Sequence, residues 1–355
     1  MNGMRGMIQR ILVVGLTLVL MGGFARRGMS QPTGQPKSLQ VSWIDTEGGS
    51  SVLFITPAGE SVLIDTGNPG QRDPGRIAAA AKEAGLAKID YLIITHYHID
   101  HFGGAADLAK LIPIGTLYDH LDENPSRDKP NADYLAIKVE KRVLISAGDV
   151  IPLKQAPGSP AIKLQCMAAR KKFVEDSPYA KPNQFISLAK GKAIDLTDNA
   201  NSVVMLLTFG DFRSYHGGDL TWNVENDMMN PINRIGTVDV YQVTHHGLDQ
   251  SNNPVLVQAL EPTVAVMNNG TRKGCEPEEF ATLKATPSIK DIWQVHRNLR
   301  PDGTMNNTAP ELIANMDQDC KGNLIHMVVA PDAKRYTISI PATGVSKTYE
   351  TRKHN

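Results

Sequence analysis

The stretch at residues 95–104, THYHIDHFGG, constrains the fold of this chain most strongly, because it holds three histidines and one aspartate within six positions. The apolar run YLII at residues 91–94 directly precedes it and is typical of a buried strand. In an extended chain His96, His98 and Asp100 lie on one face, whereas on a helix they would scatter. Neutral imidazoles and a carboxylate are suitable ligands for zinc or a similar ion. The stretch therefore predicts a metal site just beyond a strand end.

Other ligand-type residues stand at comparable places in the second half of the chain. His101 completes the cluster, and the only adjacent pair among the 10 histidines is His245-His246, in VTHHG. Asp219, in HGGDL, is an acid after a strand-like run, and the glycines before it let the backbone come close to a ligand. A carboxylate placed there can bridge two ions, which two-metal hydrolytic sites hold about 3.5–4 Å apart.

Strand-like and helix-like segments alternate in clusters along the chain. This order of segments indicates two sheets packed face to face with helices outside, rather than one doubly wound parallel sheet. Strands are expected at residues 39–45, 50–57, 61–67, 89–96, 115–121, 202–210, 212–219, 238–247, 264–270, 326–331 and 335–341. Helices are expected at residues 75–86, 104–112, 253–262 and 277–285.

The N-terminus has the pattern of a secretory signal peptide at residues 1–30. Arginines precede an apolar run at residues 11–25, and small residues then offer cleavage after Ala25 or Ser30. An uncleaved N-terminal anchor is the alternative, although the run is short against the roughly 20 residues of a membrane span. We expect a linker at residues 31–38, one folded domain at 39–345 and a disordered tail at 346–355. The mature domain would be exported, periplasmic or secreted, without stable membrane insertion after cleavage.

Export makes the three cysteines informative, because disulfides form in oxidising compartments. Cys275 and Cys320 both lie in polar, turn-like segments, which favours a bridge between them. Cys166 lies in an apolar, strand-like run and is expected as a buried free thiol.

The complete His-x-His-x-Asp-His pattern at residues 96–101 resembles the metallo-β-lactamase-fold hydrolases. Within that superfamily the chain is most similar to the ComEC-type hydrolase domain and its stand-alone relatives. The stretches WIDTEGGSSVLF, VLIDTG, DNANSVVMLLTFGDFRSYHGGDL and VTHHGLDQSNNP carry this closer resemblance. It implies an α+β four-layer αββα sandwich in a single domain, with two divalent ions at one edge of the sheets. Zinc is the expected ion and manganese the alternative.

The resemblance also implies a role for each matching residue. His96 and His98 correspond to ligands of the first metal, Asp100, His101 and His245 to ligands of the second, and Asp219 to the bridging ligand. His246 is an alternative to His245, or a proton donor facing the substrate. Asp65 corresponds to an acid that holds the metal loop by hydrogen bonds. Asp100 or Asp219 would orient the attacking hydroxide.

Some positions depart from the family pattern or stay ambiguous. No histidine occurs in LQCMAARKK, where many members supply a third ligand to the first metal, although the ComEC-type relatives lack it too. Leu248 stands where a serine is usual, and Cys275-Glu276 replace a Gly-His-Pro element. His120, His216 and His296 lie near strand ends, so each is either a site contact or a structural residue.

The pattern predicts hydrolysis by a metal-bound hydroxide, since neither a GxSxG nor a P-loop motif occurs. The resemblance points to a substrate with a phosphodiester bond, with nucleic acid as one candidate and a small molecule as the other. The balance of 37 basic and 37 acidic residues gives no support for a polyanion partner. Residues 170–172 and 272–273 are local basic candidates for phosphate contacts, or solvated loop charge. The alternatives are a lactone, lactam or other ester hydrolase, and a metal-binding module without catalysis.

Overall fold

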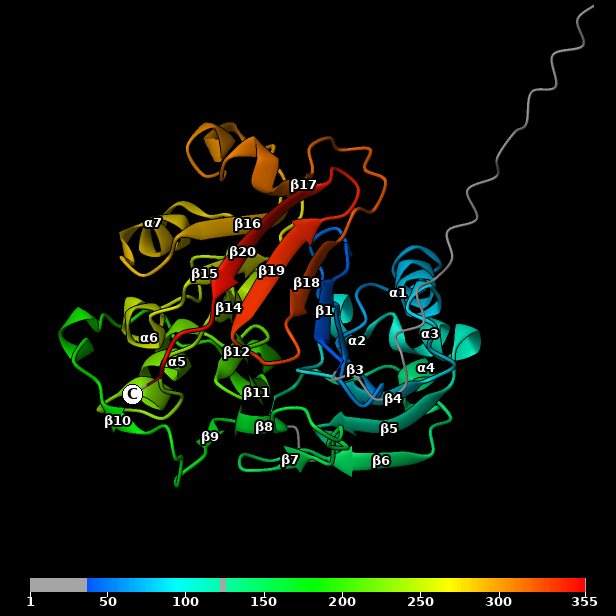
Figure 1. Cartoon of the computed structure of the whole chain (residues 1–355). Coiled ribbons are helices and arrows are strands. Elements are labelled where there is room, and N and C mark those ends of the chain that lie inside the picture. The colour runs from blue at the N-terminus through cyan, green and yellow to red at the C-terminus, as the bar shows by residue number, and fades with distance from the viewer. Residues whose placement is uncertain (1–36, 122–125, 355) are drawn as a thin grey trace, which may run out of the picture. The chain divides into compact units, whose positions relative to one another are not determined.

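The computed structural model describes residues 37–121 and 126–354, so the predicted signal peptide and most of the predicted linker lie outside the described residues. Two large sheets dominate the fold, and their strands face each other across one core (Figure 1). In the described ranges, no helix combines the length and apolar character needed to cross a bilayer.

Sheet A contains nine strands in the order β20-β19-β18-β1-β2-β3-β4-β5-β6. Its strands from β3 to β6 are parallel, and the others are antiparallel. The strands are β1 (Leu39–Trp43), β2 (Val52–Ile55), β3 (Ser61–Ile64), β4 (Ile89–Ile93), β5 (Ile114–Asp119), β6 (Lys141–Leu144), β18 (Ile325–Val329), β19 (Arg335–Ile340) and β20 (Val345–Glu350).

Sheet B has the order β17-β16-β15-β14-β12-β11-β8-β7, with β9 paired to β8. The strands from β12 to β17 along this path are parallel. The strands are β7 (Val150–Ile151), β8 (Ile162–Ala169), β9 (Lys172–Phe173), β11 (Val204–Phe209), β12 (Phe212–His216), β14 (Val240–Gln242), β15 (Val264–Met267), β16 (Asp291–His296) and β17 (Ile313–Asn315). A separate pair joins β10 (Lys181–Pro182) to β13 (Ile232–Asn233).

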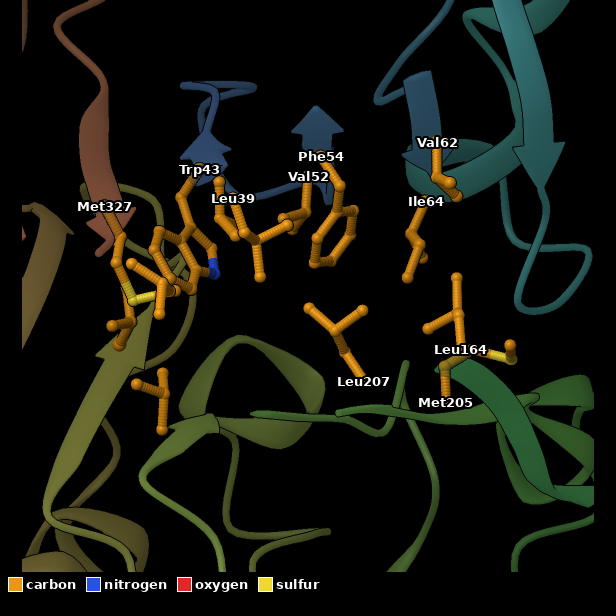
Figure 2. Close-up of a cluster of buried hydrophobic side chains, with 14 of the residues drawn as sticks. Leu39, Trp43, Val52, Phe54, Val62, Ile64, Leu164, Met205, Leu207 and Met327 are labelled. Atoms are coloured by element: carbon orange, nitrogen blue, oxygen red, sulfur yellow. The ribbon is translucent and has the colours of Figure 1, made fainter. Parts of the chain in front are cut away.

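The core between the sheets is apolar because alternate residues of each strand point inward. Trp43 and Phe54 of sheet A point toward the strands that carry Leu164, Met205 and Leu207 of sheet B (Figure 2). All five side chains are at most 1% exposed. Burying such side chains stabilises a fold by about 1.5–3 kcal/mol each, so this layer fixes how the two sheets pack.

Helices cover the outer faces of both sheets. Sheet A packs on α1 (Arg72–Glu83), α2 (Ile99–Phe102), α3 (Ala105–Leu111) and α4 (Ala132–Leu135). Sheet B packs on α5 (Trp222–Met229), α6 (Pro254–Leu260) and α7 (Pro277–Ala285). Short 3₁₀ turns are η2 (Ile186–Leu188), η3 (Asp198–Asn201), η4 (Thr244–Gly247), η5 (Pro301–Thr304) and η6 (Pro310–Leu312). The predicted four-layer αββα sandwich in a single domain is confirmed.

The predicted disordered tail at residues 346–355 is wrong for most of its length. Residues Val345–Glu350 form β20, which pairs antiparallel with β19. Tyr349 is buried and stacks on Tyr336, with ring centroids 5.3 Å apart. Beyond the strand, the Arg352 amide donates to Asp239 Oδ1 at 2.8 Å. In VSKTYE, buried or half-buried positions alternate with exposed ones, as in a strand. The polar composition of the segment made this pattern hard to recognise in the sequence.

The predicted disulfide between Cys275 and Cys320 is also absent, since all three cysteines are free thiols. Cys275 is buried against Met267, with 3.1 Å between the two sulfur atoms. Cys320 instead donates to Asp45 Oδ2 at 3.1 Å. The two thiols thus belong to different packing environments. Cys166 is buried, as expected.

Candidate metal centre

The residues of the predicted site lie at the carboxyl ends of parallel strands in both sheets (Figure 1). Asp65 follows β3, and the histidine cluster follows β4. Asp219 follows β12, and η4 with its two histidines follows β14. The two edges approach closely at Gly218, where an added Cβ would lie 2.9 Å from the Cβ of Thr95. A glycine is therefore required beside Asp219.

Asp219 lies at the centre of this edge and is 2% exposed. Four buried histidines direct Nε2 at its Oδ2 atom. The distances to this oxygen are 3.2 Å from His101, 3.3 Å from His245, 3.5 Å from His246 and 3.8 Å from His96. Segments far apart in sequence thus converge on one carboxylate oxygen.

The second ring nitrogen of each histidine has a partner outside the centre. The Nδ1 contacts are Thr95 Oγ1 at 3.1 Å for His96, Asp65 Oδ2 at 2.7 Å for His101, Ser251 Oγ at 3.1 Å for His245 and the Asn268 carbonyl at 3.2 Å for His246. Holding Nδ1 in this way fixes the ring and leaves Nε2 for the centre. Metal-binding histidines are usually oriented by such contacts.

Asp65 makes hydrogen bonds to the segment that follows β4, the type of contact that the sequence resemblance implies. Its carboxylate accepts from the Thr95 amide and the Thr95 hydroxyl, each at 2.8 Å, as well as from His101. Its backbone is left-handed, with φ of 61°. This conformation at the end of β3 turns the side chain toward the loop that follows β4.

The donor atoms form two groups of metal-ligand size. His96, His101 and Asp219 form one group, and Asp100, His101 and His246 form the other, with the donor atoms of each group within 4.8 Å of one another. His98 belongs to neither group. Its side chain is 29% exposed, and its Nε2 lies 3.4 Å from Asp128 Oδ2.

The electrostatics of the centre suit a cation. Burial raises the pKa of Asp219, but His101, His245 and His246 outweigh it and hold this pKa well below its usual range. Burial lowers the pKa of His96 well below its usual value, which favours the neutral ligand form. In the described part of the chain, the buried Nε2 of His96 has no hydrogen-bond partner. A buried, unpartnered imidazole nitrogen facing a carboxylate oxygen fits a divalent ion.

The two neighbouring histidines of η4 have different surroundings. His246 Nε2 lies 3.3 Å from Asp100 Oδ2 and 3.2 Å from His101 Nε2, so His246 joins the group that the sequence analysis assigned to His245. His245 Nε2 instead lies 3.3 Å from Asn199 Nδ2. Both histidines have φ of 55°, so the alternation of an extended strand does not apply to this pair.

The structure does not bring His216 or His296 to the centre. His216 points between the sheets, where Nδ1 lies 2.8 Å from Gln242 Oε1 and the ring packs edge-on against Phe54. His296 Nε2 lies 2.6 Å from Asp45 Oδ1 in a separate cluster. His120 is buried, and burial lowers its pKa to about 3.

No pattern in the sequence indicated the supporting residues Thr95, Asn199, Ser251 and Asn268. Only Ser251 and Asn199 fall in stretches that carried the family resemblance, and neither has a local chemical signature. The sequence marks Lys273 only as one of several local basic residues. In the structure its ammonium pairs with Asp100 Oδ2.

Residues 45–166 match the family described as the metallo-beta-lactamase superfamily. The chain is 27% identical over 274 residues to a "metal-dependent hydrolase" of Anaeromyxobacter sp. (strain K), covering 74% of this chain and 86% of that protein. It is 26% identical over 253 residues to "ComE operon protein 3" of Bacillus subtilis (strain 168), covering 65% of this chain. The chain spans only 28% of the length of the Bacillus protein.

A solved structure titled as a metal-dependent hydrolase of the beta-lactamase superfamily, Tm1679, is also similar. It is 16% identical with a TM-score of 0.42, and the match covers 72% of this chain and 95% of that one.

Proposed function

We propose that the chain is a metal-dependent hydrolase of the metallo-β-lactamase superfamily, to which residues 45–166 match, and that it hydrolyses phosphodiester bonds with two divalent ions held at the edge of its sheets. Zinc is the proposed ion and manganese the alternative. The convergence of four histidine Nε2 atoms on Asp219 Oδ2 is the observation that carries this proposal.

We assign the ligands from the two groups of donor atoms. His96 and Asp219 would hold the first ion, and His98, which contacts Asp128 in this structure, would have to turn to join them. His101 belongs to both groups, and we assign it with Asp100 and His246 to the second ion. Asp219 Oδ2 lies 3.2 Å from His101 Nε2 and 3.5 Å from His246 Nε2, so Asp219 would be the ligand shared by both ions. A bound divalent ion lowers the pKa of water, supplies hydroxide near pH 7 and offsets negative charge on the reacting oxygens.

The protein's own residues position this chemistry. Asp65 accepts from His101 Nδ1 and so keeps His101 Nε2 directed at the centre. Asp219 and Asp100 provide the carboxylate oxygens that would orient the attacking hydroxide. The side chains of His98 and Asp100 are 29% and 18% exposed, whereas those of His96 and His101 are fully buried. We infer that the substrate approaches from the side of His98 and Asp100.

The resemblance to the ComEC-type hydrolase domain supports a phosphodiester over a neutral ester. The zero net charge of the chain gives no further support for a long nucleic acid. A lactone, lactam or other ester is the competing substrate class, and a metal-binding module without catalysis is the competing function.

A substrate panel tests these alternatives. Protein treated with a chelator and reloaded with Zn²⁺ or Mn²⁺ would be given a bis-aryl phosphodiester, linear DNA, a lactone and a cephalosporin. We expect metal-dependent hydrolysis of the bis-aryl phosphodiester to exceed that of the lactone and the cephalosporin. Preferred turnover of either of those two would replace the proposed substrate class. Binding of metal without hydrolysis of any substrate would support the non-catalytic module.

We also propose that the protein is exported, on the strength of the signal-peptide pattern at residues 1–30. Expression of the full chain, followed by fractionation and mass analysis of its N-terminus, tests this. A chain starting after Ala25 or Ser30 in the periplasm or medium is the expected result. An unprocessed chain in the cytoplasmic fraction would overturn the proposal.

A further inference from the structure

Lys273 brings a positive charge to the rim of the candidate metal centre. Its ammonium pairs with Asp100 Oδ2. The same oxygen lies 3.3 Å from His246 Nε2 and 3.6 Å from His101 Nε2. The lysine side chain is 36% exposed and the Asp100 side chain 18% exposed. Lys273 therefore reaches from the solvent side to the second group of donor atoms.

The loop that carries Lys273 is fixed by contacts on both sides. The Arg300 guanidinium donates to the carbonyls of Arg272, Gly274 and Cys275, and it is itself paired with Asp302. Gly274 lies directly on η4, where an added Cβ would be 1.8 Å from the His246 carbonyl oxygen. The position of Lys273 is thus coupled to the backbone of a proposed ligand.

The hairpin formed by β1 and β2 packs against the same loop from the other side. An added Cβ at Gly48 would lie 3.3 Å from the Cβ of Lys273. The neighbouring Ser50 amide donates to the Asp100 carbonyl at 3.1 Å. The loop with Lys273, the hairpin and the helix with Asp100 therefore form one packed rim. A lysine held there meets any substrate that reaches Asp100.

Charge determines what such a lysine can bind. Two divalent ions and Lys273 would outweigh the carboxylates of Asp65, Asp100, Asp128 and Asp219, so the loaded site would be positive. An ammonium is a strongly hydrated point charge that binds phosphate oxygens. Lys273 also competes with an ion for Asp100 Oδ2, so it does not strengthen metal binding.

We propose that Lys273 binds a non-bridging oxygen of the substrate phosphate next to the second metal position. This inference rests on the proposed function and specifies how its site selects an anionic substrate. It predicts that removing the charge of Lys273 affects the affinity for phosphate and the affinity for metal differently. The affinity for phosphate falls, whereas the affinity for metal stays the same or rises.

Binding of inorganic phosphate to Zn²⁺-loaded protein, measured by titration calorimetry, tests the inference without requiring turnover. We expect Lys273→Gln to weaken phosphate binding at least about tenfold, a typical loss for one charge-assisted hydrogen bond. Lys273→Arg keeps the charge and should retain most of the binding. Lys290→Gln, at an exposed lysine between α7 and β16, is the control and should change little.

Two further measurements separate the possible failures. Zn²⁺ affinity, from competition with a chelator, should be unchanged or tighter in Lys273→Gln. For the bis-aryl phosphodiester, KM should rise more than kcat falls. Phosphate affinity within twofold of wild type, or a large loss of Zn²⁺ affinity, would overturn the role of Lys273. Lysine-dependent phosphate binding without phosphodiester hydrolysis by the wild type would instead refute the proposed function and leave the anion site standing.

Discussion

Two clusters among the described residues bring aspartate and histidine together with the donor spacing of a metal site, and they differ in how the acid is neutralised. The ligand cluster contains His96, Asp100, His101, Asp219 and His246. The Asp45 cluster contains Asp45, His296 and Cys320, whose donor atoms also lie within 4.8 Å of one another. By donor spacing alone both are possible metal sites.

Arginine distinguishes the two clusters. Arg76 donates to Asp45 Oδ2 and to the Asp45 carbonyl, each at 3.1 Å, and pairs with Glu47. His296, Cys320 and the Glu47 amide also contact the Asp45 carboxylate, at 2.6 Å, 3.1 Å and 2.8 Å. A metal ion there would have to displace a guanidinium. Asp219 has only imidazoles around it among its ion-pair contacts in the described residues. Donor geometry therefore has to be weighed with charge balance.

The largest expected effect comes from Asp219→Asn. The change preserves the shape but removes the charge that four histidines face. We expect kcat/KM to fall at least about a hundredfold, which corresponds to roughly 3 kcal/mol of lost transition-state stabilisation. The variant should be compared with wild type at matched metal content, with folding checked by circular dichroism.

Asp195→Asn is the matched control for that experiment. Asp195 caps its own loop by accepting from the Thr197 amide at 2.7 Å, outside the ligand cluster. Its rate should stay within about threefold of wild type, as expected for a substitution away from the core. Wild-type activity in Asp219→Asn would mean that the bridging acid lies elsewhere and that the ligand cluster is no more a metal site than the Asp45 cluster.

A smaller effect should separate the two histidines of η4. His246→Ala removes a donor atom 3.3 Å from Asp100, so it should weaken binding of the second ion by about thirtyfold or more. His245→Ala should weaken it less, because His245 approaches Asp219 and Asn199 instead. Chelator competition measures both affinities. The reverse order would return His245 to the second metal, as the sequence resemblance implies.

The sequence predicted the fold well because its signals are local and repeated. Apolar runs mark the strands, and glycines mark the turns between them. The four residues of the cluster at 96–101 were predictable for the same reason, since they lie close together in the chain, in the loop that follows β4 and in α2. The strand β20 was missed because only one of its residues, Tyr349, is both apolar and buried.

The remaining part of the site depends on backbone turns that the sequence does not reveal. His245 and His246 are both left-handed, so neither strand nor helix periodicity says which one faces Asp100. His216 lies two residues before Gly218, which also has positive φ, and its side chain turns into the core. Lys273 reaches Asp100 across 173 positions of sequence. Only tertiary packing creates that contact.

The smallest expected effect is that of Cys320→Ser, which tests the comparison at the Asp45 cluster. The thiol makes one of several contacts to Asp45, and a serine hydroxyl can still donate, so the free energy of unfolding should fall by less than about 1 kcal/mol.

Burial raises the pKa of Cys320 to about 11, with Asp45 adding to the effect. The thiol is therefore protonated near pH 7, and metal ligation would require its deprotonation beside Arg76. Elemental analysis should give the same number of ions per chain for Cys320→Ser and wild type. A loss of one equivalent in the variant would show that the Asp45 cluster binds metal despite its arginine, and charge balance would no longer separate the two clusters.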